Sequence, residues 1–214
     1  MEKKFELTDN FVINALGIKL FQIKCTKAFK NANEGDLGGY VEKEENLSQS
    51  GDAWVYGDAW VYGNAQVYGN AQVSGDARVS GNAQVYGNAQ VYGDARVSGD
   101  AWVYGNAQVS GDARVSGDAW VSGNARVSGD AWVSGDARVE NDHMHCGFDC
   151  FGSCNRHTHA YMTNENKVEI RCGCFRGSIE EFERKVKETH AGTIYEKQYK
   201  AIINLIKIKF GIDG

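Results

Sequence analysis

Cysteine and histidine side chains gather in one part of the sequence, near its C-terminal end. The stretch HMHCGFDCFGSCNRHTH covers residues 143–159, and CGC follows at 172–174. Thiolate and neutral imidazole groups are good ligands for Zn²⁺. The spacing C-x3-C-x3-C with H-x-H is not that of a standard zinc finger, but four ligands from this set would form a closed, structural site for one zinc ion. The candidate zinc ligands are Cys146, Cys150, Cys154, His157, His159, Cys172 and Cys174.

Other interpretations of the same residues stay open. The cysteines can form a buried or incidental thiol cluster, or two of them can act as a redox pair. A catalytic interpretation makes Cys174 a nucleophile, with His190 or His157 as its base. Such a pair requires the thiol and the imidazole to be in contact, and sequence spacing alone does not show whether they meet.

The elements that must position these residues begin with a long repeat. Residues 51–140 contain the hexad G-[DN]-A-x-V-[YS] fifteen times without a break. Within each hexad, Ala and Val alternate with other residues, which is the period-two pattern of a strand. Gly followed by Asp or Asn supplies a corner, because these residues tolerate positive φ. A corner every six residues predicts a coil, and three hexads, or eighteen residues, close one triangular turn.

The hexads resemble the hexapeptide repeat of left-handed parallel β-helices, with a branched aliphatic residue inside and a small residue four positions later. The fold class is therefore predicted as mainly β, a left-handed parallel β-helix of about five coils over residues 51–140. The open ends of such a helix must be covered. We expect an N-terminal β-hairpin and cap over residues 1–50 and a small C-terminal α+β domain over residues 141–214.

The predicted C-terminal domain consists of a β-hairpin and two helices. Residues 158–162 and 168–174 alternate around a polar turn and predict the hairpin. Ser178 and Glu181 form a capping-box pattern at the start of the first helix. A second helix is expected from about Tyr195 to Phe210, and its predicted buried stripe is Tyr199, Ile202, Ile203 and Ile206.

Aromatic residues fall into register when the hexads are stacked at eighteen residues. Trp102 lies one coil below Trp120, and the neighbouring column contains Tyr68, Tyr86 and Tyr104. Exposed aromatic residues in one strip are typical of a partner surface. Cross-strand stacking that only stabilises the ladder and a sugar ligand stacked on tryptophan are the alternatives.

Arginines form a second column of candidate binding residues. Arg78, Arg96 and Arg114 lie one coil apart, and their repulsion requires compensation. Aspartate occupies the corner position of each of these hexads. We therefore expect each Asp to neutralise the neighbouring Arg.

Charge and composition restrict the class of partner and the location. The net charge is −5, and residues 51–140 contain 5 arginines against 9 aspartates and one glutamate. This acidity makes a nucleic-acid partner unlikely, because phosphate binding needs a positive surface. No run of eighteen apolar residues predicts a membrane span. The N-terminal residues lack a signal-peptide core, so we expect a cytoplasmic protein.

The order of the segments also resembles a family of phage and prophage hexapeptide-repeat proteins. The resemblance rests on GDLGGYVEKEENLSQ at residues 35–49, on the hexad array, and on GCFRGSIEEFERKVKETH at residues 173–190. It implies a setting of infection or lysogeny in a bacterial host cell and does not imply a particular reaction.

Our first functional hypothesis is a non-enzymatic binding protein of the phage type. It would inhibit or sequester a host protein or a small ligand, as an anti-defence factor does, and would form a homodimer or homotrimer. A virion or surface-recognition module is one alternative. A hexapeptide-repeat acyltransferase-like enzyme is another, although residues 51–140 contain neither the histidine nor the interrupting loop that those enzymes use.

Overall fold

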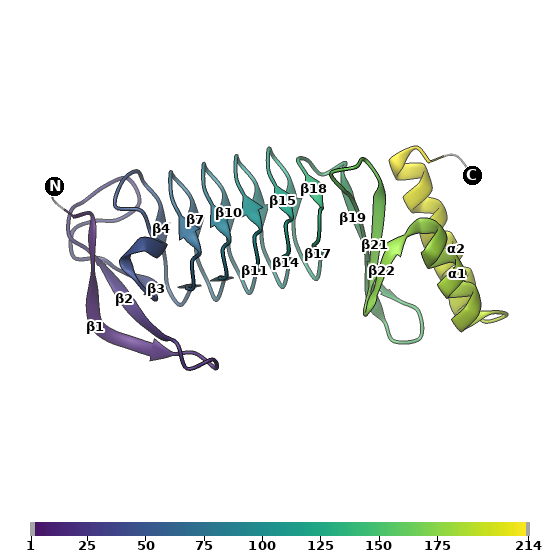
Figure 1. Cartoon of the computed structure of the whole chain (residues 1–214), viewed down its shortest axis with the longest axis horizontal. Coiled ribbons are helices and arrows are strands. Elements are labelled where there is room, and N and C mark those ends of the chain that lie inside the picture. The colour runs from purple at the N-terminus through teal and green to yellow at the C-terminus, as the bar shows by residue number, and fades with distance from the viewer. Residues whose placement is uncertain (1–2, 213–214) are drawn as a thin grey trace.

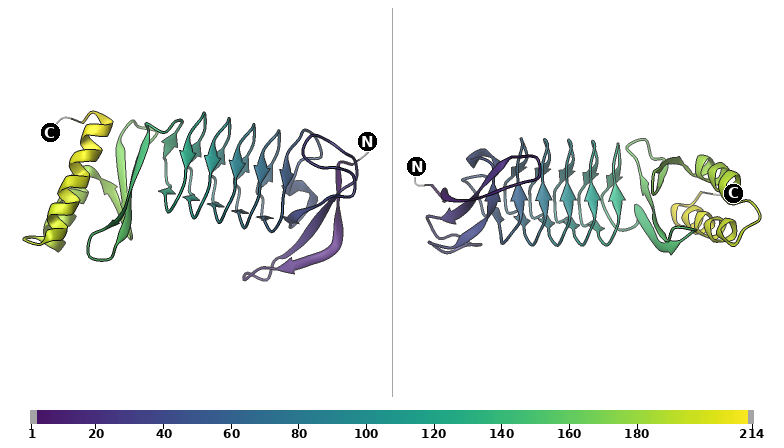
Figure 2. Two further views of the ribbon diagram at one scale, coloured as in Figure 1. Left: turned by 180° about the vertical axis from the view of Figure 1, so that it is seen from behind. Right: turned by 90° about the horizontal axis from the view of Figure 1, so that it is seen from below.

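The computed structural model describes residues 3–212 and shows an elongated molecule (Figure 1). Stacked coils, which we call the shaft, form its middle. A hairpin projects from the shaft at the N-terminal end (Figure 1). A small sheet and two helices lie at the opposite end, with the sheet between the shaft and the helices (Figure 2). The two end units therefore have no contact across the length of the shaft.

Each hexad forms one two-residue strand, which consists of the variable residue x and the valine. The prediction of a mainly β fold is confirmed. The fifteen strands are β4 (Trp54–Val55), β5 (Trp60–Val61), β6 (Gln66–Val67), β7 (Gln72–Val73), β8 (Arg78–Val79), β9 (Gln84–Val85), β10 (Gln90–Val91), β11 (Arg96–Val97), β12 (Trp102–Val103), β13 (Gln108–Val109), β14 (Arg114–Val115), β15 (Trp120–Val121), β16 (Arg126–Val127), β17 (Trp132–Val133) and β18 (Arg138–Val139).

Strands three hexads apart pair in parallel, so the register is eighteen residues as expected. Val97, for example, pairs with Val79 on one side and Val115 on the other. The shaft has three sheets, ordered β5-β8-β11-β14-β17, β4-β7-β10-β13-β16 and β6-β9-β12-β15-β18. The valines and alanines of the hexads are buried inside the coils. Removal of this apolar surface from water is the main stabilising contribution of each coil.

The corners depend on glycine for two reasons. Gly81 has a φ of 70°, in the left-handed region that disfavours side chains. A Cβ atom at Gly81 would also lie 2.9 Å from the backbone nitrogen of Gly99 in the next coil. The corners of successive coils are thus in direct backbone contact.

The N-terminal unit adds a turn to the shaft. Strands β1 (Phe5–Ile13) and β2 (Lys19–Cys25) form the predicted antiparallel hairpin. Strand β3 (Leu37–Val41) pairs antiparallel with β2 and parallel with β5. The fifteen hexads form the five coils expected. The solenoid as a whole has about six turns, because the N-terminal segment follows the path of a coil without having the hexad sequence.

The N-terminal unit also closes the first regular coil. Backbone N–H groups of each coil donate to carbonyl groups of the following coil, so the carbonyl groups of the first coil need other donors. Lys4 Nζ donates to the Ala53 carbonyl at 2.9 Å. Asn46, at the end of the 3₁₀ helix η1 (Glu44–Asn46), donates through Nδ2 to the Ala65 carbonyl at 2.8 Å. On the third side, the backbone of β3 donates to the coil.

The C-terminal unit is an antiparallel sheet covered by two helices on one face. The predicted hairpin, both helices, the capping box and the buried stripe of the second helix are all confirmed. Two further strands extend the hairpin on either side and were not expected. The elements are β19 (His145–Phe151), β20 (Arg156–Met162), β21 (Val168–Cys172), β22 (Phe175–Ser178), α1 (Ile179–His190) and α2 (Ile194–Phe210).

Candidate functional site

Five aromatic side chains form a continuous strip on the sheet β6-β9-β12-β15-β18. We call Tyr68, Tyr86, Tyr104, Trp102 and Trp120 the aromatic strip. The tyrosine rings stack in parallel, with centroids 4.8 Å and 5.0 Å apart. The two tryptophan rings stack at 5.0 Å with an interplanar angle of 5°. The predicted vertical alignment of both columns is confirmed.

The two columns of the aromatic strip also contact each other. Tyr86 meets Trp102 edge to face, and Tyr104 meets Trp120 in the same way, each with centroids 6.3 Å apart. The Arg138 guanidinium covers the outer end of the strip, 3.7 Å from the centroid of Trp120. All five rings are half-buried, and burial raises the pKa of Tyr68 and Tyr86. The rings are therefore held in fixed positions and keep part of their surface in solvent.

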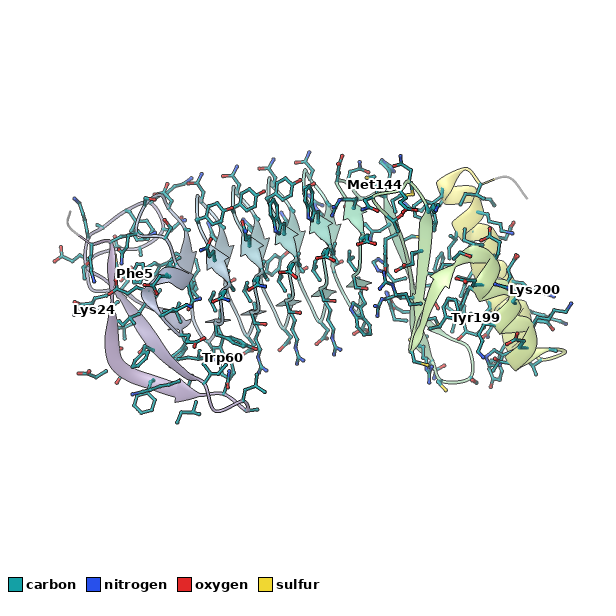
Figure 3. All side chains as sticks on the ribbon, viewed as in Figure 1. Phe5, Lys24, Trp60, Met144, Tyr199 and Lys200 are labelled. Atoms are coloured by element: carbon teal, nitrogen blue, oxygen red, sulfur yellow. The ribbon has the colours of Figure 1, made fainter. Side chains whose placement is uncertain are left out.

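The arginine column lies on a different sheet, and its arginines form no direct ion pairs with the corner aspartates. Within residues 3–212, no carboxylate lies within 4.0 Å of the Arg78, Arg96 or Arg114 guanidinium. The corner aspartates and these arginines are all exposed, and exposed charges gain little from pairing because solvent screens them. The Arg78 guanidinium instead lies 4.5 Å from the ring centroid of Trp60. Rows of projecting side chains line the shaft (Figure 3). Within the binding residues predicted from sequence, the arginines are thus separate from the aromatic strip.

The sheet of the C-terminal unit separates the histidines from the buried cysteines. The predicted pairing of residues near 158–160 with residues near 170–172 is confirmed, since Thr158 pairs with Cys172. However, successive side chains in a strand point to opposite faces. Cys146 and Cys172 pack against the helices, whereas His159 pairs with Arg171 and faces the last coil of the shaft.

His159 is buried at the end of the shaft, and both of its ring nitrogens have partners. Nδ1 lies 3.1 Å from the Trp132 carbonyl, and Nε2 lies 3.0 Å from Nδ1 of His145. A seventh coil would otherwise supply the donor to this carbonyl. Burial lowers the pKa of His159 to about 3 and also lowers the pKa of His145. The neutral His159 ring thus closes the hydrogen bonding of the last coil, and in this arrangement both of its nitrogens are engaged.

His157 lies beside His159 and has a different environment. Its Nδ1 is paired with Asp149, while its Nε2 is buried without a hydrogen-bond partner. A carboxylate-bound histidine of this kind is suited to metal ligation or to proton transfer. No group of three or more His, Cys, Asp or Glu side chains converges anywhere in residues 3–212. Zinc binding therefore stays a prediction, and elemental analysis of untagged protein decides it.

The remaining cysteines lie near the turns of the sheet. Cys150, Cys154 and Cys174 are exposed, and all six cysteines are free thiols. Burial raises the pKa of Cys146 to about 11, which disfavours its thiolate. Thiols are weak nucleophiles and weak metal ligands unless they ionise.

Cys174 lines a cavity of about 210 Å³ between the sheet and the helices, together with His190 and Tyr199. Tyr199 projects from α2 towards the sheet (Figure 3). The ring of His190 stacks on Tyr199 with centroids 5.5 Å apart. In residues 3–212, no hydrogen bond joins the Cys174 thiol to His190 or His157. The cysteine–histidine catalytic pair therefore stays a prediction.

Sequence reasoning missed a second cavity, between the shaft and the sheet. We call it the junction pocket, and its volume is about 230 Å³. Its lining residues are Asp130, Trp132, Arg156, His157, His159, Arg171 and Gly173. Only the two histidines were candidates from sequence. The register of β20 with β21 places Arg171 opposite His159 on the face towards the shaft. Arg156 alternates to the other face and lines both the junction pocket and the cavity between the sheet and the helices. This register is not visible before the strands are paired.

Comparison with known proteins identifies the repeat. Residues 71–87, 89–105, 107–123 and 119–135 match the family model described as the YdcK Beta solenoid repeat. Together with the three stacked parallel sheets, this match decides the architecture. The protein is a β-solenoid repeat protein. Its C-terminal unit lies outside the matched residues, and a comparison of the solenoid protein with curated proteins finds no match. No helix in residues 3–212 is long and apolar enough to cross a membrane.

Proposed function

We propose that this β-solenoid protein is a non-enzymatic binding protein and that the aromatic strip is its recognition surface. The observation that supports the proposal is the rigid stacking of five half-buried rings. Large side chains that are already fixed lose little conformational entropy when a partner covers them. Tyrosine and tryptophan are also enriched among the residues that dominate binding energy.

The borders of the strip support a protein partner over a small ligand. Asparagine side chains form a hydrogen-bonded ladder along one corner, for example Asn88 to Asn106 at 3.1 Å. The other corner contains the contact of Asn82 with Asp100 at 2.8 Å. An apolar centre with a polar border is the usual composition of a protein–protein interface. The strip runs along an outer face of the shaft, which suits an extended or flat partner.

The setting in which the protein acts is proposed from the resemblance to phage and prophage hexapeptide-repeat proteins. In that setting the partner is a host protein, which the solenoid inhibits or sequesters in the bacterial cytoplasm. The alternative partner for the aromatic strip is a second copy of the chain, which would give a homodimer or homotrimer. The experiment below distinguishes the two.

A double substitution tests the proposal. Trp102→Ser with Trp120→Ser removes the largest rings of the strip without touching the buried valines. The matched control is Trp60→Ser, since Trp60 occupies the same hexad position on another sheet and is also half-buried. Each protein is measured for thermal stability, for mass by sedimentation, and for capture of partners from host lysate.

We expect the double variant to stay folded and to lose either its oligomeric mass or its captured partner, while Trp60→Ser keeps both. A lower mass identifies a second copy as the occupant, and loss of a captured protein at unchanged mass identifies a host partner. If the double variant keeps both its mass and its partner, the strip is only a stacking ladder and the proposal is wrong.

A further inference from the structure

The junction pocket has the chemistry of a site for a small anion. It lies between the last coil, represented by Asp130 and Trp132, and the shaft-facing side of β20 and β21. Its volume of about 230 Å³ is large enough for a small molecule and too small for a peptide segment or a base pair.

Two guanidinium groups in the junction pocket lack a carboxylate partner. Within residues 3–212, neither Arg156 nor Arg171 has an acidic oxygen within 4.0 Å. Arg176 is a useful comparison, because it lies on the same sheet next to Arg171 and is paired with Glu169 at 2.7 Å. Arg171 therefore differs from Arg176, whose charge is paired, and also from the unpaired arginines of the arginine column, which are exposed whereas Arg171 is half-buried.

Arg171 is held in place although its charge is uncompensated. Its guanidinium lies 4.1 Å from the ring centroid of Trp132, and its Nε is buried without a hydrogen-bond partner. A buried donor without an acceptor is costly. A ligand that supplies an acceptor would remove this cost. The stacked guanidinium is already held in a fixed orientation, from which it can donate to the ligand.

The acidic groups near the junction pocket do not neutralise its arginines. Asp149 is paired with His157. Asp130 lines the pocket but is exposed at a corner of the shaft. Arg156 also lies near the thiols of Cys154 and Cys174, and its guanidinium is charged at physiological pH.

From this geometry we propose that the junction pocket binds a small molecule through a phosphate or carboxylate group, with Arg171 and Arg156 as its donors. Guanidinium groups match both kinds of oxyanion by paired N–H···O bonds. The face of Trp132 that Arg171 covers is not available for stacking, so recognition rests on charge and hydrogen bonding. This site is separate from the aromatic strip, and its test does not depend on the strip.

The ligand would bridge the shaft and the C-terminal unit. A molecule that binds only the folded state raises the unfolding temperature in proportion to its saturation. We would measure binding by calorimetry and thermal unfolding of the full chain with three probes at constant ionic strength: inorganic phosphate, succinate and ribose 5-phosphate. Sodium chloride is the reference for non-specific ionic effects.

We expect saturable binding of at least one probe, with a higher unfolding temperature. Phosphate-only binding indicates a phosphate ligand, and succinate-only binding indicates a carboxylate ligand. Arg171→Gln should weaken binding about tenfold or more, which is the usual scale for losing a charge-assisted hydrogen bond. Arg184→Gln, an exposed arginine on α1, should bind as the unmodified chain does.

Arg156→Gln keeps the test decisive if Arg171→Gln does not fold, because Arg156 is exposed and does not stack on the shaft. It should fold and bind more weakly. The proposal is overturned if no probe binds saturably, or if the folded Arg156→Gln and Arg171→Gln proteins bind as tightly as Arg184→Gln.

Discussion

The two ends of the solenoid solve the same problem with different chemistry. At the N-terminal end, the first coil needs hydrogen-bond donors, and a charged amine, an amide and the backbone of β3 supply them. At the C-terminal end, a neutral imidazole donates to the Trp132 carbonyl, and the Asp142 carboxylate accepts from the Arg126 N–H at 2.8 Å. Identical coils can thus be closed by unrelated groups, provided that each backbone group finds a partner.

The difference between the ends has consequences for ionisation. Burial lowers the pKa of Lys4 to about 8, so the amine stays largely charged near neutral pH. Burial lowers the pKa of His159 to about 3, so the imidazole is neutral. The N-terminal end therefore tolerates a partly buried charge that the C-terminal end excludes.

The largest expected effect comes from breaking the shaft that both ends close. Val97→Asp places an unpaired carboxylate inside the central coils, which costs several kcal/mol, about 3 or more. We expect the shaft to lose cooperative unfolding, measured by circular dichroism during heating. Arg96→Asp is the matched control, because it places the same side chain one residue away on the surface, and it should unfold much as the original chain does. A soluble Val97→Asp protein that unfolds cooperatively at the original temperature would contradict the buried-valine core.

The next effect is at the N-terminal end. Asn46→Leu removes a fully buried amide that donates to the Gly63 and Ala65 carbonyls. Orphaned buried acceptors cost about 1–3 kcal/mol each, so urea unfolding should shift to clearly lower concentration. Glu45→Leu, an exposed neighbour, should leave the midpoint almost unchanged. Equal midpoints for the two variants would mean that water closes this edge without the amide.

A smaller effect is expected at the C-terminal end. His159→Phe keeps a ring of similar shape but leaves the Trp132 carbonyl and His145 Nδ1 without their partner, at a cost of about 1–3 kcal/mol for the buried carbonyl. Urea unfolding measures the loss, with the exposed His143→Phe as control. Should His159→Phe be more stable than the original chain, the hydrogen bond to Trp132 would not be what closes the last coil.

Mild acid should weaken the C-terminal end selectively. The folded-state pKa of His159 is below its unfolded value, so the unfolded chain binds more protons as pH falls from about 6.5 towards 3. Stability is then fully present above the unfolded pKa and falls by up to about 1.4 kcal/mol per pH unit in this window. Hydrogen exchange should show the C-terminal unit opening before the N-terminal hairpin. The pH dependence should be flatter in His159→Phe, and an identical slope would assign the acid sensitivity to other groups.

The shaft could be predicted from sequence because one short pattern repeats. Alternation placed Val97 and its equivalents inside, and a register of eighteen residues aligned Trp102 with Trp120. The additional turn before Gly51 could not be predicted, since Leu47 takes the place of a hexad valine without the corner and strand residues around it.

The junction pocket could be predicted only in part. His157 and His159 were recognised as reactive residue types, but their roles depend on which face of the sheet they occupy. Strand β19 contains mixed polar, small and aromatic residues, so its pairing with β20 leaves no clear alternation in the sequence. Without that pairing, the histidines and the buried cysteines could not be assigned to opposite faces. The contributions of Trp132 and Arg171 arise from contact between distant segments.

Because the corner glycines of successive coils are in direct contact, the shaft can be lengthened or shortened only by whole layers. Insertion or deletion of eighteen residues would add or remove one complete layer of about 4.8 Å and leave every face and both end units in their original alignment. A change of six residues would instead rotate everything after it by one third of a turn and divide the aromatic strip between two faces. Gene variants that differ in repeat number should therefore keep function in steps of three hexads, and the shaft would act as a molecular ruler between its two ends.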